Sequence, residues 1–144
     1  MNISFFLTPK AMTAYIYCND TIRQGMEKMY HHGYTAIPVL DEDGHYLGTI
    51  TEGDFLWTVL DFHHPMPEMR DLEKRYISEI PLRWNYVSVH INATMEELYH
   101  RSISQNFIPV VDDRGMFIGI VTRQDIIKYF AKTREIIDEK VRDD

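Results

Sequence analysis

The feature that most constrains this chain is an internal repeat of 24 residues, whose two copies lie 71 positions apart. Residues 33–56 align with residues 104–127 without a gap, and eight of the aligned pairs are identical. The identical positions of the first copy are Ile37, Pro38, Val39, Asp41, Gly44, Gly48, Thr51 and Asp54. A repeat of this length indicates a fold in which one supersecondary unit is used twice.

The same order of elements surrounds each copy of the repeat. Capping residues followed by apolar positions at helical spacing predict one helix after Thr21 and another after Thr94. Apolar runs on both sides of a turn that ends in glycine predict a β-hairpin in each copy. The predicted strands are 15–18, 35–40, 46–51, 86–90, 107–111 and 117–122, and the helices that follow the hairpins are predicted at 53–62 and from about Gln124. We therefore predict an α/β (α+β) fold of two β-α-β-β-α units with a long C-terminal helix.

The segments between these elements set the predicted domain boundaries. Residues 1–62 comprise an N-terminal lead-in and the first repeat, and residues 85–144 comprise the second repeat with the C-terminal helix. The connector between them is 63–84, and its section from Met69 to Ile80 has a weakly helical pattern. We interpret these parts as one intertwined module.

Both ends of the chain carry apolar residues that the two repeats do not account for. The lead-in contains Phe5–Leu7, and we expect it to pack on another surface, such as a partner subunit. The last helix keeps apolar residues at a spacing of three or four as far as Val141. It either folds back on its own domain or pairs with another subunit, and the pattern slightly favours pairing.

The composition argues against several classes of protein. The formal charge is −7 and Lys and Arg form no run, which argues against a nucleic-acid partner. The apolar stretch near the N-terminus is too short for a signal peptide or a membrane span, so we expect a cytoplasmic location without a membrane partner. The lone cysteine, Cys18, excludes an internal disulfide and fits a reducing compartment.

The first copy reads G-x-x-x-x-P-V-x-D, and both copies end in T-x-x-D. With these motifs in this order, the chain resembles a tandem pair of CBS domains, the regulatory Bateman module, in a stand-alone protein of the bacterial type. The resemblance covers nearly the whole chain, about 15–62 and 86–130. It implies two units related by a pseudo-twofold axis, association into a homodimer, and up to two adenine-nucleotide sites in the cleft between the repeats. It also implies no catalysis, no metal and no required cofactor, so the chain is expected not to be an enzyme.

The repeated T-x-x-D motif is chemically suited to a nucleotide. It places a hydroxyl and a carboxylate at a helix N-terminus, where free N–H groups and the helix dipole favour phosphate. Ordinary N-capping explains such residues in a single copy, whereas the doubled context favours a ligand. By resemblance, each site combines residues of both repeats. The favoured site is Tyr34, Thr35, Ala36, Pro38, Ile120, Thr122, Arg123, Gln124 and Asp125, and the second is Gln105, Asn106, Phe107, Pro109, Ile50, Thr51 and Asp54.

The two sites differ in the residue that follows the threonine. Arg123 would place a cation beside a phosphate, whereas Glu52 would repel one. We therefore expect the site with Asp125 to be occupied and the site with Asp54 to be weak or empty. The strongest phosphate-binding members of the family carry basic residues where this chain has Thr35, Ala36, Asn106 and Phe107. The difference favours AMP, ADP or a cyclic dinucleotide such as cyclic di-AMP over a triphosphate.

Metal and nucleophile chemistry find little support in the pattern. The pairs His31–His32 and His63–His64 are adjacent residues that point in different directions, so we interpret them as surface or capping residues. Cys18 has no neighbouring sequence context that would supply a base or a thiolate.

Two functional classes therefore remain open. In the first, the chain is a regulatory protein that binds AMP, ADP, ATP or cyclic di-AMP between its repeats and signals to a downstream protein. In the second, it is a dimerisation or protein-interaction module without a ligand. Nucleotide binding by the purified protein distinguishes the two classes.

Overall fold

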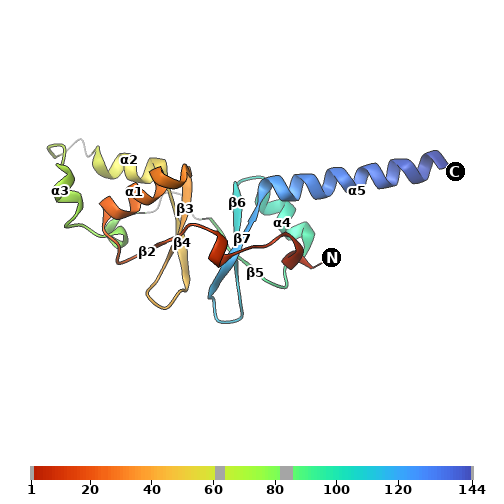
Figure 1. The fold of residues 1–144 in the computed structure, drawn as a ribbon, viewed down its shortest axis with the longest axis horizontal. Helices are drawn as coiled ribbons and strands as arrows, with labels where there is room; N and C mark the ends of the chain where they lie inside the picture. Colours follow the sequence, from red (N-terminus) through yellow and green to blue (C-terminus); the bar gives the residue numbers. More distant parts are fainter. Residues whose placement is uncertain (1, 61–63, 82–85, 144) are drawn as a thin grey trace.

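The computed structural model describes residues 2–60, 64–81 and 86–143. Its elements form two halves that lie side by side along the long axis of the molecule (Figure 1). The first half holds β2 (Ile16–Tyr17), α1 (Ile22–His32), β3 (Ala36–Leu40), β4 (Tyr46–Thr51) and α2 (Glu52–Val59). The second half holds β5 (Val89–His90), α4 (Met95–Ser102), β6 (Phe107–Val111), β7 (Phe117–Thr122) and α5 (Arg123–Asp143). The predicted fold class, with two β-α-β-β-α units and a long last helix, is confirmed.

The two hairpins share one register because they share one sequence pattern. Ile37 pairs with Ile50 in the first hairpin, and the aligned residues Ile108 and Val121 pair in the second. These side chains are all fully buried, so each sheet turns one apolar face towards the helices of its own half. Each half consequently has its own hydrophobic core.

Helix α1 begins and ends as its sequence predicts. The hydroxyl of Thr21 accepts a hydrogen bond from the backbone N–H of Gln24, and the Gln24 side chain accepts one from the N–H of Thr21. The helix ends at Gly33, which has a φ of 67° and donates its N–H to the last carbonyls of the helix. The end of α1 therefore places Tyr34 and Thr35 at the start of β3.

The N-terminal lead-in packs on the second half of the same chain. Its strand β1 (Thr8–Pro9) joins the second sheet next to β7, so the strand order is β1-β7-β6-β5, whereas the first sheet is β2-β3-β4. Ile3, in a 3-10 turn at Ile3–Phe6, is fully buried in the second core. A β-carbon on Gly119 would lie 2.2 Å from the backbone oxygen of Thr8, so glycine is required where β1 crosses β7.

The connector packs on the first half. Its helix is limited to α3 (Met69–Leu72), followed by a 3-10 turn at Ile77–Glu79, so the helical prediction for Met69–Ile80 was too long. The backbone between these elements bonds to the start of α1 instead, with the N–H of Ile22 donating to the carbonyl of Arg75. Leu72, Ile77 and Ile80 belong to the first core. The boundaries proposed at 62/63 and 84/85 lie outside the described residues, as do Phe62, the predicted end of the second helix, and His63.

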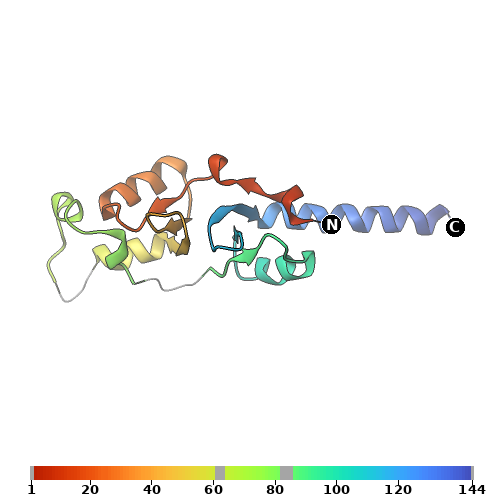
Figure 2. The same cartoon turned by 90° about the horizontal axis from the view of Figure 1, so that it is seen from below.

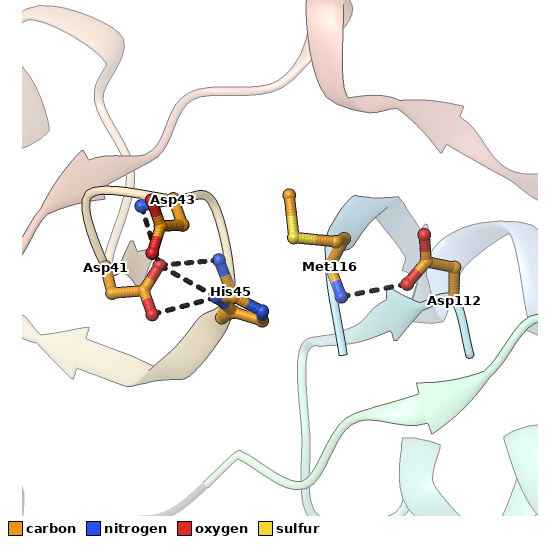
Figure 3. A network of polar contacts seen from close by, with 5 residues as sticks. All are labelled: Asp41, Asp43, His45, Asp112 and Met116. Atoms are coloured by element: carbon orange, nitrogen blue, oxygen red, sulfur yellow. Dashed lines mark hydrogen bonds and ion pairs between the residues drawn. The ribbon is translucent and has the colours of Figure 1, made fainter. Parts of the chain in front are cut away.

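The tips of the two hairpins join the halves. The N–H of Phe117 donates to the carbonyl of Gly44 at 3.0 Å, and the N–H of Tyr46 donates to the carbonyl of Gly115 at 3.2 Å. His45 and Met116 form the bridge between them, and Figure 3 shows the two turns facing each other. The Phe117 ring lies 6.1 Å from the ring of Tyr15 and 6.4 Å from that of Tyr46. An apolar and hydrogen-bonded joint therefore connects the two halves.

Helix α5 continues well beyond the second core. Figures 1 and 2 show it projecting along the long axis, away from the first half. The described part of the helix does not fold back on its own domain.

Candidate ligand-binding site

A cavity of about 290 Å³ lies between the halves, which is near the lower end of the range for ligand pockets. We call it the inter-repeat cavity. Six residues of the favoured site line it, together with two from the second site: Tyr34, Thr35, Ala36, Pro38, Ile120, Thr122, Asn106 and Phe107. Strand β3 with the two residues before it, the start of β6 and strand β7 supply these residues, so both repeats form the walls.

The start of α5 forms one side of this cavity. Thr122 lines it, and its hydroxyl accepts a hydrogen bond from the N–H of Asp125 at 3.2 Å. The N–H of Arg123 donates to the carbonyl of Asn106 at 2.9 Å, which fixes the helix start against the beginning of β6. Thr122 therefore caps α5 through its hydroxyl and also lines the cavity, so the two interpretations of this residue do not exclude each other.

Three residues of the favoured site lie outside the cavity lining. The Nε of Arg123 donates to the carbonyls of Ser102 at 2.7 Å and of Gln105 at 3.1 Å, so this side chain holds the loop before β6. Gln124 is exposed. Asp125 lines a neighbouring groove on α5 together with Lys128.

Apart from Asn106 and Phe107, which line the inter-repeat cavity, the residues of the second site make contacts within their own half. Thr51 and Asp54 form a reciprocal capping box, and Asp54 is only 2% exposed. The buried amide of Gln105 accepts from the N–H of Val87 and donates to the carbonyls of Val87 and Phe107. Pro109 is buried in β6, and Ile50 is buried in the first core. These contacts use the Asp54 carboxylate and the Gln105 amide, two polar groups that a ligand of this site would need.

A half-buried tyrosine, Tyr46, lies beside this second region. The hydroxyl of Tyr46 donates to the carbonyl of Tyr86 at 2.6 Å and bonds the hydroxyl of Thr49 at 2.8 Å. Burial raises the pKa of Tyr46, so its hydroxyl stays protonated and acts as a donor at neutral pH. It links the first hairpin to the start of the second repeat.

The inter-repeat cavity is mostly apolar, with a few polar groups and no charged side chain in its described lining. Among the described residues that line it, none is ionisable at neutral pH, and its polar groups are threonine hydroxyls, the Tyr34 hydroxyl and the Asn106 amide. Such a lining supplies hydrogen bonds to a nucleoside and leaves a run of phosphates without a cation. The geometry fits a ligand with few phosphate charges in the cavity itself.

Sequence reasoning missed one wall of the cavity, which the lead-in forms. Thr8, Met12, Thr13 and Ala14 line it because β1 runs beside Ile120 of β7. Gly119 is the sequence signal of that close approach, but a glycine in a strand does not identify the segment that approaches it.

One group of side chains has the composition of a metal site. Asp41, Asp43 and His45 each offer an atom within 4.8 Å of the others. Figure 3 shows that Asp41 is already used by the turn, since it accepts from the N–H groups of Asp43 and His45. The bond from the His45 N–H is the main reason why the pKa of Asp41 is lowered. The aligned residues Arg114 and Met116 do not repeat the group.

The chain matches a known family model twice. The model described as CBS domain matches residues 10–61 and 77–132. Within the described residues, no helix combines the length and the apolar character that crossing a bilayer requires.

Curated relatives share the sequence over most of this chain. An uncharacterized protein of Methanopyrus kandleri is 28% identical over 80% of this chain and 56% of its own length. Cyclic di-AMP receptor B of Bacillus subtilis is 24% identical over 88% of this chain and 84% of its own length. The L-aspartate semialdehyde sulfurtransferase of Methanocaldococcus jannaschii is 27% identical over 78% of this chain. The chain spans only 20% of that enzyme, and about half of the Methanopyrus protein.

Solved structures share the fold. CbpB in complex with c-di-AMP superposes with a TM-score of 0.82 at 21% identity, over 96% of this chain and 91% of that one. CBSX2 in complex with AMP superposes with a TM-score of 0.71 at 19% identity, over 92% of this chain and 98% of that one. At these identities the superpositions establish the architecture of the chain.

Proposed function

Since the chain belongs to the CBS-domain family, as a tandem pair of CBS domains, we propose that it is a non-enzymatic regulatory protein that binds an adenine nucleotide in the inter-repeat cavity. The observation that carries the proposal is that this cavity has walls from both repeats and includes Thr122 at the start of α5. The candidate ligands are AMP, ADP, ATP and cyclic di-AMP. The cavity volume and its uncharged lining favour a ligand with one or two phosphates.

Relatives support a nucleotide of this class. One similar protein is named a cyclic di-AMP receptor, one similar structure is a complex with c-di-AMP, and another is a complex with AMP. The relatives with enzyme names match this chain over only about a fifth of their length, so their names do not argue for catalysis here. We therefore assign regulation and no catalysis to the tandem pair.

The proposed signal is a change in the angle between the halves. A ligand that touches β3 and β7 together binds best to one arrangement of the two repeats, and its binding energy favours that arrangement. The joint at the hairpin tips gives this motion a pivot, because in the described part of the chain two backbone hydrogen bonds join Gly44 and Gly115 to the opposite hairpin. A homodimer and a downstream protein would read the change.

A thermal-shift experiment tests the proposal. The panel contains AMP, ADP, ATP, S-adenosylmethionine, NAD and cyclic di-AMP, each with wild type and with Thr122→Val. A ligand at about a hundred times its Kd stabilises the folded state by roughly 2.7 kcal/mol, which raises Tm by several degrees. We expect one nucleotide to give this shift in wild type and Thr122→Val to lose most of it.

The matched control is Thr51→Val. Both variants lose one N-cap hydroxyl, so their stability without ligand should fall by a similar amount, about 1 kcal/mol. Only the variant in α5 should lose the ligand response. If no member of the panel shifts Tm, the ligand-free interaction module replaces this proposal. If both variants lose the response equally, the ligand does not bind at Thr122 in particular.

The role of Asp125 is tested in the same panel. We propose that it binds the ribose from the edge of the cavity, since it follows Thr122 by one turn. Asp125→Ala should weaken the ligand response about tenfold in Kd, whereas Asp54→Ala should leave it unchanged. An unchanged response in Asp125→Ala would limit the site to the cavity lining.

A further inference from the structure

A groove of about 570 Å³ runs along one side of α5, next to the lead-in, and we call it the α5 groove. It has about twice the volume of the inter-repeat cavity. One face of α5 supplies most of its lining, since the residues alternate between spacings of three and one, and the lead-in adds a phenylalanine: Asp125, Lys128, Tyr129, Lys132, Thr133, Ile136 and Phe6. From Asp125 to Ile136 this face is about 16 Å long.

The floor of the α5 groove is apolar. The rings of Phe6 and Tyr129 meet edge to face, with their centroids 5.2 Å apart. Phe6 also packs against the second core, so the 3-10 turn at Ile3–Phe6 holds this part of the floor in place. Ile136 continues the floor on the projecting part of α5, where it is 46% exposed. An apolar surface therefore begins at the second core and continues along the helix.

The rim of the α5 groove is basic. Lys128 and Lys132 are four positions apart, which places both side chains on the same side of the helix. Both are exposed, and in the part of the chain that the structure describes neither ammonium group has an ion pair or a hydrogen bond. The whole chain carries a formal charge of −7, so this rim is a local exception. It gives a negatively charged partner a preferred place to bind.

Negative charges at both ends of the rim limit the length of the basic section. Asp125 lies at the end next to the start of α5. At about 100° per residue, Glu135 and Glu139 follow the two lysines on the same side of the helix. An acidic group is therefore attracted to the section between Lys128 and Lys132 and repelled on either side of it.

The α5 groove is a separate surface from the exposed apolar residues of the same helix. At the same rotation per residue, Ile127, Phe130 and Ile137 lie on roughly the opposite side, so the groove stays open when they are covered. The groove also adjoins the inter-repeat cavity, because Thr122 lines the cavity and Asp125, one turn later, lines the groove. A protein bound in the groove would thus contact the helix end that we assign to the nucleotide.

We propose that the α5 groove binds an acidic segment of a partner protein. Its carboxylates pair with Lys128 and Lys132, and an aromatic or aliphatic side chain packs on Tyr129 and Ile136. The proposal rests on the downstream protein of the proposed function and assigns the surface that this protein contacts. Pockets for small ligands bury most of the ligand, whereas the lysines and Ile136 are exposed. A long open groove with apolar anchors two helical turns apart is instead suited to a protein segment.

Peptide selection tests the chemistry of the partner. A phage-displayed library of random peptides is selected on the full chain without nucleotide. We expect the recovered peptides to carry acidic residues beside a large apolar one. The tightest of them, labelled with fluorescein, is then the probe in anisotropy titrations that measure Kd.

Two matched pairs of variants locate the bound peptide. Lys128→Glu should raise the Kd of the probe about tenfold, because it replaces an attraction by a repulsion. Lys74→Glu makes the same charge change on the connector and should leave Kd near that of wild type. Ile136→Ser should raise Kd about fivefold through lost apolar contact, whereas Ile137→Ser, at the exposed neighbour outside the groove, should leave it unchanged. All four side chains are exposed, so we expect the fold to be kept, and circular dichroism verifies it.

Several results would overturn the docking surface. It fails if the selection recovers no acidic peptide, or if the two members of either pair change Kd equally. If no peptide is recovered and Lys128→Glu removes the Tm shift of the nucleotide panel, the lysines bind a phosphate of the ligand instead. A nucleotide shift without peptide binding rejects the docking surface and keeps the nucleotide site. Peptide binding without any nucleotide shift keeps the docking surface and rejects the nucleotide site.

Discussion

Helices α2 and α5 begin with the same Thr-x-x-Asp motif but use it differently. In α2, Asp54 is buried and returns the capping hydrogen bond to Thr51. In α5, Asp125 is only half-buried, and Thr122 faces the inter-repeat cavity. The first copy of the motif therefore only caps its helix, while the second copy leaves its polar groups accessible to a ligand.

The residues opposite each motif strengthen this contrast. Thr35 and Tyr34 line the cavity that α5 faces, and Tyr34 is 41% exposed. Its aligned partner Gln105 is 4% exposed and uses its amide to tie Val87 to Phe107. Repetition of a fold thus preserves the positions of polar groups without preserving their availability.

The largest expected effect comes from Gly119, where strand β1 packs closely against β7 of the same sheet. Gly119→Ala should destabilise the protein by about 3 kcal/mol, because the new β-carbon meets the Thr8 backbone, which cannot rotate away as a side chain would. Urea unfolding measures the loss. Gly33→Ala is the control, since its positive φ costs about 1 kcal/mol and its β-carbon meets nothing within 4 Å. Equal losses would show that β1 is not held against β7.

Removing the Gln105 amide should have the next largest effect. Gln105→Ala removes the bonds of its amide to the part-buried backbone of Val87 and to the buried carbonyl of Phe107, and should cost about 2 kcal/mol in urea unfolding. Tyr34→Ala, at the aligned position, should cost much less but weaken nucleotide binding. The contrast between the halves fails if Gln105→Ala impairs binding more than Tyr34→Ala does.

The two aspartates should differ by a smaller amount. Asp54→Ala loses a reciprocal cap and should cost about 1.5 kcal/mol, whereas Asp125→Ala should cost about 0.5 kcal/mol. Chemical denaturation without ligand compares them. A larger loss for Asp125→Ala would mean that the second copy is also mainly a structural cap.

The smallest effect concerns the hairpin turns, in which the two repeats agree. Asp41 accepts mainly from the N–H of His45, and Asp112 from the N–H groups of Arg114 and Met116, and these bonds lower both pKa values below 3.8. The stabilisation is present above the unfolded-state pKa and is lost as pH falls through the lowered folded-state pKa. Asp41→Asn and Asp112→Asn should each reduce the loss of stability between about pH 5 and about pH 2. If the pH dependence of stability in one variant equals that of wild type, the aspartate of that turn does not contribute and the two turns differ.

The sequence predicted the elements that occur in both repeats, and it missed the contacts that occur only once in the chain. The hairpins, the Thr21 cap and the end of α1 follow local rules that act within a few residues, and all are found in the structure. The pairing of β1 with β7 joins segments about 110 residues apart. Gly119 is the sequence signal that we find for this pairing. The connector failed as a helix for a similar reason, because Arg75 pairs with the distant Ile22.

The candidate site was predictable in outline only. The family resemblance assigned Thr35, Ala36 and Thr122 to one site, and all three line the cavity because strand and helix order fixes their positions. It could not predict that Arg123 would bond to the carbonyls of Ser102 and Gln105, since rotamer and loop geometry decide between that contact and a ligand. Burial, which separates Asp54 from Asp125, likewise depends on packing across the whole half.

The pairing of β1 with β7 has a consequence for synthesis on the ribosome. The edge strand of the second sheet is made first, and its partner at Gly119 and Ile120 follows about 110 residues later. At 5–20 residues per second this is a wait on the order of ten seconds. During that time Ile3 and its neighbours have no core to enter, while the first repeat can already close. The nascent chain therefore offers an early apolar segment to chaperones, and its release marks completion of the second repeat.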